Sequence, residues 1–312
     1  MTSNVQKAKK GIVLVTTADT DMLTADLALA SIEASEFPGV RAFNPVTLDS
    51  DAAEEDLLSA VGAAGVVVLR LLGGKQAMPR TFDSLVALCH SQGIPLIACP
   101  GHQEWDEDLV TACSVPVVEL ETVFSYLMRG GIQNFRNLFI FLSDTYLGSE
   151  HGHEAPEPVP WEGIYHPEAD ESVDVETFIA QRFVSGRPSV GLLFYRAHWM
   201  SGNLEFIDEL IHSLEAQDVN VLPVFSFSLK HNPEEDGQRS RTLSEFMAYP
   251  DGSARVDCII NTMGLAISDL AVEGATIASG WSVDFLDKLN VPIIQGIVST
   301  GTNQEWRDSS LG

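Results

Sequence analysis

Two basic side chains, Arg196 and His198, directly follow an apolar run at residues 190–195. Such a run is typical of a strand that is buried on both faces of a parallel sheet. Ligands of open α/β sheets bind outside the carboxyl ends of the strands, which is where both side chains are expected. A guanidinium can pair with a carboxylate through two hydrogen bonds, and a neutral imidazole can accept a proton or coordinate a metal ion. One interpretation of this pattern is a site for an acidic ligand, with His198 as the one candidate contact to a metal.

Ser201 and Asn203 stand where the next helix is expected to begin, after a loop that carries Arg196 and His198. A helix N-terminus presents free backbone N–H groups and a partial positive charge, which suit an anion. Both residues are therefore candidate ligand contacts. In a second interpretation, Ser201 or Asn203 only caps the helix and His198 only bonds a neighbouring backbone group. The local features alone favour this second interpretation.

Arg70 follows another apolar run and precedes Gly73, Gly74 and Lys75. This segment can approach a carboxylate or a phosphate, so Arg70 is a further candidate ligand contact. Its spacing differs from that of a P-loop, and no G-x-G-x-x-G fingerprint follows a strand in this chain. We therefore infer neither nucleotide binding nor hydride transfer on a dinucleotide.

His166 lies in a short apolar patch, residues 164–167, inside an acidic segment. An imidazole in such a patch is a candidate contact to a ligand or a proton acceptor. The alternative is that Ile164 and Tyr165 anchor the segment to the second domain and His166 belongs to that anchor.

Three further motifs favour a structural interpretation. Asp19 and Thr20 follow the first strand and are expected to cap a helix rather than to bind a ligand. Cys99 precedes His102 closely, but an apolar-packed thiol is a poor nucleophile. Residues 150–154 carry two imidazoles and two carboxylates, yet in a proline-rich loop they are expected to form a solvated segment rather than a metal site.

The composition limits the possible partners. The 312 residues include 18 Lys and Arg against 44 Asp and Glu, which gives a formal net charge of −26. Nucleic acids and anionic membranes attract basic proteins, so we expect neither as a partner. No apolar run approaches the roughly 20 residues of a transmembrane helix, and residues 2–10 lack the apolar core of a signal peptide. We expect a cytoplasmic protein without a membrane span.

The four cysteines, Cys89, Cys99, Cys113 and Cys258, are far apart and have apolar neighbours. This pattern predicts small buried residues in a reducing compartment, rather than zinc ligands or a disulfide framework.

Strand and helix patterns alternate along the chain, which predicts βαβ units and an α/β fold. In the first part, strands are expected at residues 11–16, 40–45, 65–69, 95–99 and 115–118, with helices at 51–61 and 82–91. In the second part, strands are expected at residues 190–195, 219–225, 256–260 and 292–298, and the clearest helix follows Asn203. The prediction is two doubly wound parallel-sheet lobes, Rossmann-like or flavodoxin-like.

The expected domains are a first α/β lobe at residues 1–118, a connection at 119–185 and a second α/β lobe at 186–312. The connection begins with helical residues 119–144, broken at two glycines, and continues as an extended segment because prolines stand among many acidic residues. The last α/β pattern stops before its helix can bury a face, so we expect a truncated carboxyl terminus.

Several segments together resemble the amino-terminal part of the CobN-type large subunit of aerobic cobaltochelatase, from about residue 10 onward. They are VLRLLGG at 68–74, GIPL at 93–96, YLMRGG at 126–131 with Asn134 and Asn137, GIYHP at 163–167, VGLLFYRAH at 190–198 with Ser201 and Asn203, and LPVF at 222–225 with Ser228 and Lys230. The large subunit of magnesium chelatase is similar in a looser Arg-x-His and glycine pattern. The GIYHP and YRAH segments favour the cobalt member.

The resemblance implies a subunit that binds a tetrapyrrole, hydrogenobyrinic acid a,c-diamide, and receives Co²⁺ as a substrate in aerobic cobalamin biosynthesis. It also implies that separate AAA+ partner subunits, not this chain, hydrolyse ATP. Family members are several-fold longer, so this chain is expected to be inactive alone. No catalytic residue is carried over. The candidate tetrapyrrole contacts are Arg70, His166, Arg196, His198, Ser201 and Asn203.

Two alternatives stay open. The first is the H-type large subunit of a magnesium chelatase, with Mg²⁺ as the substrate. The second is a non-catalytic module of two lobes that captures an acidic small molecule or docks a partner.

Overall fold

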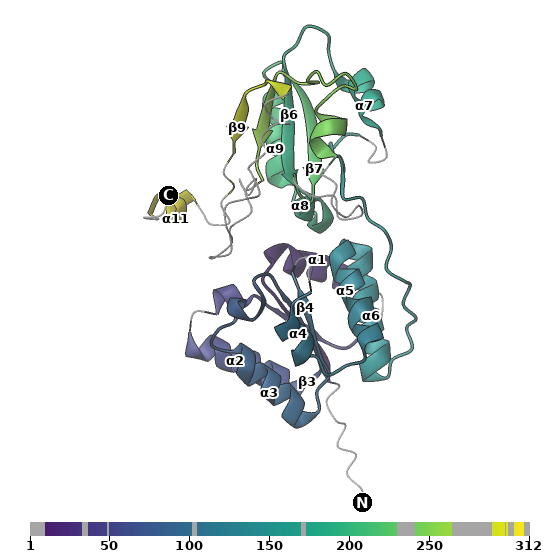
Figure 1. The fold of residues 1–312 in the computed structure, drawn as a ribbon, viewed down its shortest axis with the longest axis vertical. Helices are drawn as coiled ribbons and strands as arrows, with labels where there is room; N and C mark the ends of the chain where they lie inside the picture. Colours follow the sequence, from purple (N-terminus) through teal and green to yellow (C-terminus); the bar gives the residue numbers. More distant parts are fainter. Residues whose placement is uncertain are drawn as a thin grey trace, which may run out of the picture. The chain divides into compact units, whose positions relative to one another are not determined.

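The computed structural model describes residues 10–32, 37–48, 50–101, 105–169, 173–229, 241–263, 289–296, 298 and 303–308. They belong to two compact units (Figure 1). Unit 1 comprises Met1–Val159 with Met200–Gly202, and unit 2 comprises Pro160–Trp199 with Asn203–Gly312.

Unit 1 is built on a parallel sheet with the strand order β2-β1-β3-β4. The strands are β1 (Gly11–Thr16), β2 (Val40–Phe43), β3 (Ala64–Leu71) and β4 (Leu96–Pro100). The central strands β1 and β3 are almost entirely buried, as continuous apolar runs predict. The expected strands at the corresponding positions are confirmed.

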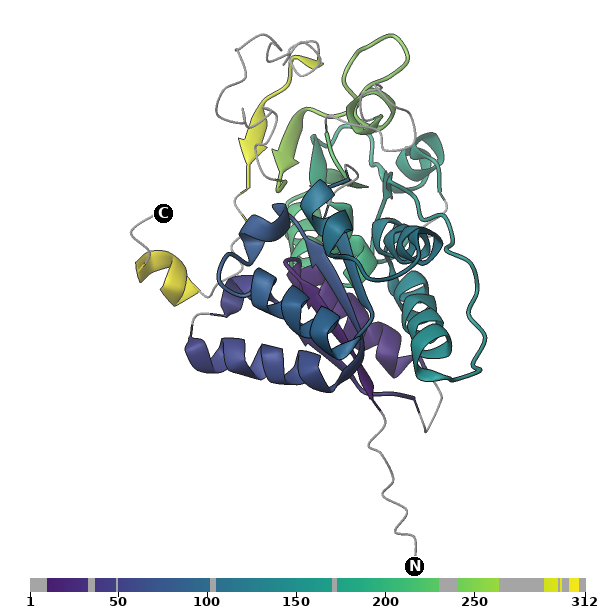
Figure 2. The same cartoon turned by 60° about the horizontal axis from the view of Figure 1, so that its bottom comes forward.

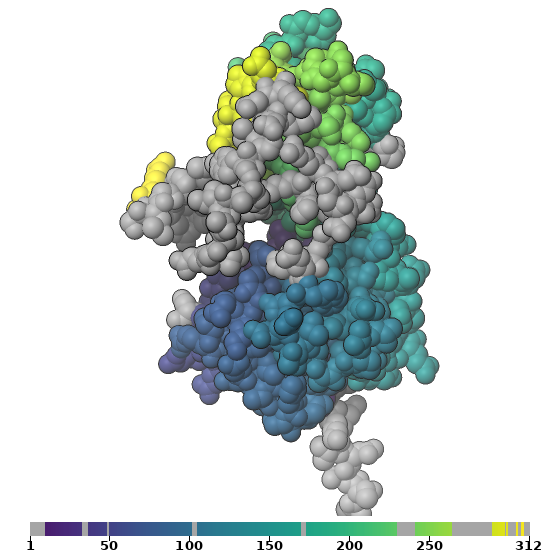
Figure 3. All heavy atoms as spheres, viewed as in Figure 1, coloured from purple at the N-terminus to yellow at the C-terminus, as the bar shows by residue number. Residues whose placement is uncertain are grey.

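Helices cover both faces of this sheet (Figures 1 and 2). On one face pack α2 (Asp51–Ala63), α3 (Phe82–Gln92) and α4 (Glu107–Ala112). On the other face pack α1 (Asp19–Ala30), α5 (Val117–Arg129) and α6 (Ile132–Leu147). Short 3-10 helices, η1 (Pro45–Thr47) and η2 (Gly74–Ala77), follow β2 and β3. The space-filling view of Figure 3 draws unit 1 in purple to teal and the described part of unit 2 in teal to yellow.

The strand expected at residues 115–118 is wrong, because helix α5 begins at Val117. Pro116 precedes the helix as its N-cap, and the first turn carries Glu119, which suits a helix N-terminus. Val117 and Val118 are both exposed, so their β-branched side chains do not mark a buried strand. The apolar stripe of α5 packs on the sheet instead.

The domain boundary expected at residue 118 therefore falls inside unit 1. Helices α5 and α6 complete the core of the first sheet instead of forming a separate connection. The break between them is confirmed at Gly130 and Gly131, whose φ values of 69° and 82° favour glycine.

The extended segment after α6 packs along unit 1 through two buried amides. Asn134 donates to the carbonyl of Glu157 (3.0 Å) and accepts from its N–H (2.9 Å), while Asn137 accepts from the N–H of Glu154 (3.0 Å). The hydroxyl of Tyr126 donates to the carbonyl of Glu154. These side chains satisfy the backbone N–H and C=O groups of the extended segment, which a neighbouring strand would satisfy in a sheet.

Unit 2 contains a five-stranded sheet with the order β5-β7-β6-β8-β9. The strands are β5 (Glu162–Ile164), β6 (Ser189–Tyr195), β7 (Asn220–Ser226), β8 (Cys258–Asn261) and β9 (Ile293–Gln295). Four strands are parallel, but β5 pairs with β7 in the antiparallel sense. The all-parallel second sheet expected from the sequence is therefore corrected to a mixed sheet with an antiparallel edge.

The described helices of unit 2 are α7 (Val175–Arg182), α9 (Glu205–Glu215) and α11 (Asn303–Asp308), with most of α8 (Arg196–Ser201) and a π-helical turn η3 (Thr242–Phe246). Helix α9 buries Ile207 and Ile211 against β6 and β7 on one face, and α7 and η3 pack on the other. None of the described helices combines the length and apolar character needed to cross a bilayer.

Candidate functional site

The carboxyl ends of β6 and β7 form the edge of the second sheet at which a ligand is expected. Tyr195, the last residue of β6, pairs with Ser226, the last residue of β7, which in turn pairs with Glu162 on β5. Arg196 follows Tyr195 directly and begins α8. The structure therefore confirms that Arg196 stands at the carboxyl edge, but it corrects the expected loop to a short helix.

Arg196 is built into the protein rather than open to solvent. Its side chain is almost completely buried, with 1% of the residue exposed. Its Nε donates to the carbonyl of Pro160 (2.6 Å), and its guanidinium lies 4.4 Å from the ring centre of Trp161. The indole also packs edge-on against Phe227. Arg196 therefore ties the start of the chain in unit 2 to the carboxyl edge.

His198 lies two residues further along α8. Its ring packs edge-on against Phe206, with the ring centres 4.9 Å apart, and the side-chain amide of Asn203 donates to Nδ1 at 3.4 Å. Burial lowers the pKa of His198, because water no longer stabilises the charged ring. The imidazole is therefore neutral at pH 7, which is the form that accepts a proton or coordinates a metal ion.

Neither Ser201 nor Asn203 caps the following helix. Helix α9 begins at Glu205, its N-cap is Leu204, and no side chain caps it. Ser201 is the last residue of α8, and Asn203 donates its backbone N–H to the carbonyl of His198 (3.0 Å). The capping interpretation is wrong for both residues. Asn203 instead closes the turn after α8 and contacts the candidate imidazole.

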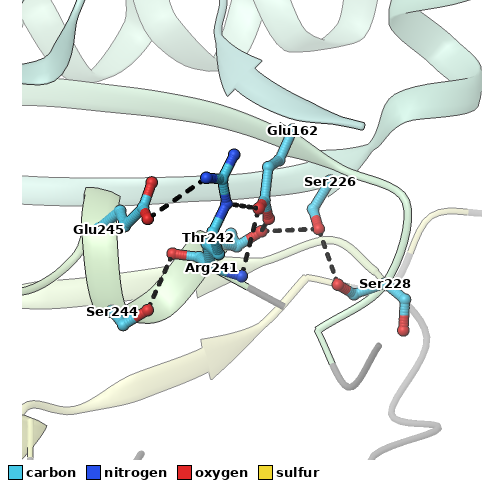
Figure 4. A network of polar contacts seen from close by, with 7 residues as sticks. All are labelled: Glu162, Ser226, Ser228, Arg241, Thr242, Ser244 and Glu245. Carbon is cyan, nitrogen blue, oxygen red and sulfur yellow. Dashed lines mark hydrogen bonds and ion pairs between the residues drawn. The ribbon is translucent and has the colours of Figure 1, made fainter. Parts of the chain in front are cut away.

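A second arginine, Arg241, reaches the same edge from a distant part of the sequence (Figure 4). Its backbone N–H and its Nε both donate to Oε1 of Glu162, at 3.2 and 3.3 Å. The hydroxyl of Thr242 donates to Oε2 of Glu162, and Thr242 also contacts the hydroxyl of Ser226 (2.8 Å). A carboxylate on β5 thus holds η3 against the end of β7.

Arg241 differs from Arg196 in its exposure. The side chain of Arg241 is 53% exposed, while that of Glu162 beneath it is 9% exposed. Nη1 lies 3.6 Å from a carboxylate oxygen of Glu245, and Nη2 contacts no polar atom among the described residues. In Figure 4 the two terminal nitrogens point away from Glu162. The guanidinium therefore presents its outer N–H groups to solvent.

His166 does not join the other candidates. Because β5 runs antiparallel to β7, the chain after Ile164 moves toward the amino end of β7. There Nε2 of His166 lies 3.2 Å from Glu215, at the end of α9, and Nδ1 accepts the N–H of Glu168 (3.1 Å). Tyr165 donates to Asp208 (2.9 Å). The anchoring interpretation of this patch fits these contacts, and both ring nitrogens are occupied.

The stability of unit 2 is expected to fall in mild acid through His166. Burial lowers the pKa of His166, against smaller effects of Glu215 and Glu168, which raise it, and of Arg182, which lowers it. The folded state then binds fewer protons than the unfolded state, so this contribution is complete above a pH of about 6.5 and is lost as the pH falls. Urea unfolding at pH 7.5 and 5.5 should show that His166→Gln loses less free energy of unfolding between these pH values than the parent. Equal losses in both proteins would refute the assignment of this acid sensitivity to His166.

Arg70 is engaged within unit 1. At the end of β3 its Nη1 lies 2.6 Å from Oδ1 of Asp21, whose Oδ2 accepts the hydroxyl of Thr16 (2.7 Å). Both charged side chains are largely buried. The expected capping by Asp19 or Thr20 is wrong, because α1 has no side-chain cap and Asp19 accepts the amide of Asn44 instead.

The motifs at Cys99 and at residues 150–154 lie in unit 1. Residues 150–154 are exposed, and the described part of the chain holds no group of three or more His, Cys, Asp or Glu that can bind a metal. The four cysteines are free; burial raises the pKa of Cys89 to about 11 and also raises that of Cys99. His102 lies outside the described residues.

A depression of about 370 Å³, lined by Cys89, His90 and Cys113, lies at the amino end of β4, opposite the carboxyl edge of the first sheet, where a ligand is expected.

The carboxyl edge of unit 2 thus combines a neutral imidazole, a buried arginine that fixes an indole, and an exposed arginine held by a carboxylate. Sequence reasoning missed Glu162, Arg241 and Thr242. Their contacts join residues that are about 80 positions apart, and no local spacing signals them. Such an edge can bind an anionic ligand and exchange a proton with it.

Comparison with known proteins gives one consistent result. The family model described as CobN/Magnesium Chelatase matches residues 124–312. The chain is 29% identical to the aerobic cobaltochelatase subunit CobN of Pseudomonas aeruginosa over 278 residues, which are 89% of this chain and 21% of that protein. It is 35% identical to the H-type magnesium-chelatase subunit of Chlorobaculum parvum over 109 residues, 33% of this chain and 8% of that protein.

Among solved structures, the catalytic subunit of cobaltochelatase from Mycobacterium tuberculosis is similar, with a TM-score of 0.57 and 26% identity. The match covers 97% of this chain and 23% of that one. The chain spans about a fifth of the length of the cobaltochelatase subunits it matches.

Proposed function

Because this chain belongs to the CobN/magnesium chelatase family, we propose that it forms the amino-terminal part of the large, tetrapyrrole-binding subunit of a cobaltochelatase. In this proposal the whole subunit binds hydrogenobyrinic acid a,c-diamide and receives Co²⁺ as its substrate in aerobic cobalamin biosynthesis. AAA+ partner subunits hydrolyse ATP in the cytoplasm to drive insertion. The chain alone is inactive, since the rest of the subunit is needed to enclose the macrocycle.

The observation that carries the proposal is the extent of the cobalt match. Similarity to cobaltochelatase subunits runs over most of the chain, whereas similarity to the magnesium subunit is limited to a third of it. A large subunit for magnesium insertion is therefore the second candidate. It keeps a specific argument in its favour, because identity to the magnesium subunit is 35% over the 109 residues that match.

In the proposed function the carboxyl edge of unit 2 contacts the tetrapyrrole. Metal insertion removes protons from the ring nitrogens, and a neutral His198 can accept one of them or contact the entering ion. Ser201 and Asn203 remain candidate contacts beside it. Arg196 acts indirectly, by fixing Trp161 at the edge, and His166 and Arg70 act through the stability of their units.

An absorbance titration distinguishes the candidates. The whole subunit is mixed with a metal-free corrinoid precursor and, separately, with a metal-free porphyrin. The proposal expects at least roughly tenfold tighter binding of the corrinoid, about 1.4 kcal/mol. Tighter binding of the porphyrin would favour the magnesium candidate. Binding of neither macrocycle would favour a non-catalytic module for another acidic small molecule.

A further inference from the structure

We propose that Arg241 binds a free carboxylate on the periphery of the macrocycle and that Glu162 positions it. This inference rests on the proposed function and names the chemical group that the carboxyl edge of unit 2 recognises. It assigns to Arg241 the role that the sequence alone suggests for Arg196.

The first support is the way Arg241 is fixed. One oxygen of Glu162 accepts both its backbone N–H and its Nε, so a single carboxylate restrains the main chain and the side chain together. Thr242 fixes the second oxygen of Glu162 and bonds Ser226 at the end of β7. A side chain held before binding loses less conformational entropy when a ligand arrives.

The second support is the part of the Arg241 guanidinium that Glu162 does not bind. Nε of Arg241 is used internally, which leaves the two terminal nitrogens as an outward-facing fork. The contact of Nη1 with Glu245 is long and both side chains are about half exposed, so little free energy opposes its replacement. A carboxylate matches such a fork with two parallel hydrogen bonds, whereas an amide or an ester lacks the charge.

The third support is the contrast with the rest of the chain. The chain carries a formal net charge of −26, so it repels a carboxylate ligand over most of its surface. Arg196, which also lies at this edge, is buried and its Nε donates to the carbonyl of Pro160. An exposed cation at the carboxyl edge therefore gives an acidic macrocycle a defined point of attachment.

A double-mutant cycle between the protein and the ligand tests the inference. Hydrogenobyrinic acid a,c-diamide and its methyl ester, in which the free carboxylates are blocked, are titrated into the whole large subunit and into its Arg241→Gln variant. Arg241→Gln is expected to weaken binding of the acid at least tenfold and binding of the ester less than twofold. Arg241→Lys should restore part of the affinity for the acid, because it keeps the charge but loses the fork.

Arg187→Gln is the matched control. Arg187 pairs with a carboxylate, that of Asp218 at 2.5 Å, is 38% exposed, and precedes β6 at the opposite edge of the same sheet. Its removal should leave both affinities unchanged. Glu162→Ala should weaken binding of the acid several-fold and spare the ester, because Arg241 then keeps its charge but loses its restraint.

Three outcomes decide against the inference. Equal losses for the acid and the ester, no loss in Arg241→Gln, or the same loss in Arg187→Gln would each overturn it while leaving the proposed function intact. If the parent subunit bound neither the acid nor the ester, the proposed function itself would fail, and the inference with it.

Discussion

Replacing Arg196 with methionine is expected to lower the free energy of unfolding of unit 2 by about 3 kcal/mol. The substitution keeps most of the side-chain volume but removes the donor to Pro160 and the cation that lies on Trp161. Loss of a hydrogen bond from a charged group costs about 1.5–3 kcal/mol, and a desolvated cation–π contact contributes up to about 2 kcal/mol. Urea unfolding followed by tryptophan fluorescence measures the difference.

Arg41→Met is the matched control for this experiment. Arg41 also lies over an aromatic ring, that of Phe43 at 4.9 Å, but its side chain is 52% exposed. Its loss should change stability by less than about 0.5 kcal/mol. If Arg196→Met were as harmless as Arg41→Met, Arg196 would not be a structural residue, and a direct contact with the ligand would become the better account of it.

Replacing Asp21 with alanine should destabilise unit 1 by roughly 2–4 kcal/mol. Asp21 is the acceptor for both Arg70 and the hydroxyl of Thr16, and the two charged side chains are only 9% and 15% exposed. Its removal leaves a largely buried guanidinium without its carboxylate, which is far more costly than loss of a surface pair. Thermal or urea unfolding of unit 1 gives the magnitude.

A surface ion pair of the same chemistry provides the comparison. Asp56 accepts from Arg41 at 2.8 Å, close to the 2.6 Å of the buried pair, but both side chains are more than half exposed. Asp56→Ala should therefore cost less than about 1 kcal/mol. Similar losses for Asp21→Ala and Asp56→Ala would show that burial does not strengthen the pair of Asp21 with Arg70.

These two results bear on how substitutions in the whole subunit are interpreted. Arg70 and Arg196 both look like ligand contacts in the sequence, yet each stabilises its own unit. Loss of tetrapyrrole binding on replacing either one is evidence for contact only if the unit stays folded.

The sheets could be predicted because their central strands are buried on both faces. Residues 11–16 and 190–195 are continuous apolar runs, and the structure places a strand on each. The same rule failed at residues 115–118, where proline and tertiary packing turn a valine-rich segment into a helix. Strand β5 was missed because three residues in a proline-rich segment carry no period, and only pairing with β7 makes them a strand.

The candidate site was predicted less completely. The sequence placed Arg196 and His198 at a strand end correctly, because strand ends follow apolar runs. It gave no measure of burial, so it could not distinguish the buried Arg196 from the exposed Arg241. The link from Glu162 to Arg241 depends on strand β5 lying beside β7, which is a long-range contact without a local signal.

The antiparallel edge strand has a consequence for dividing the protein into fragments. A recombinant piece that starts at residue 186, where the sequence suggests the second lobe begins, lacks β5 and α7. It loses Ile164 and Phe178 from its core and leaves the backbone of β7 open at the border of the sheet. An unpaired sheet edge can pair with the edge of another chain, so such a piece is prone to aggregate. A piece that starts at residue 160 keeps β5, which covers the backbone of β7.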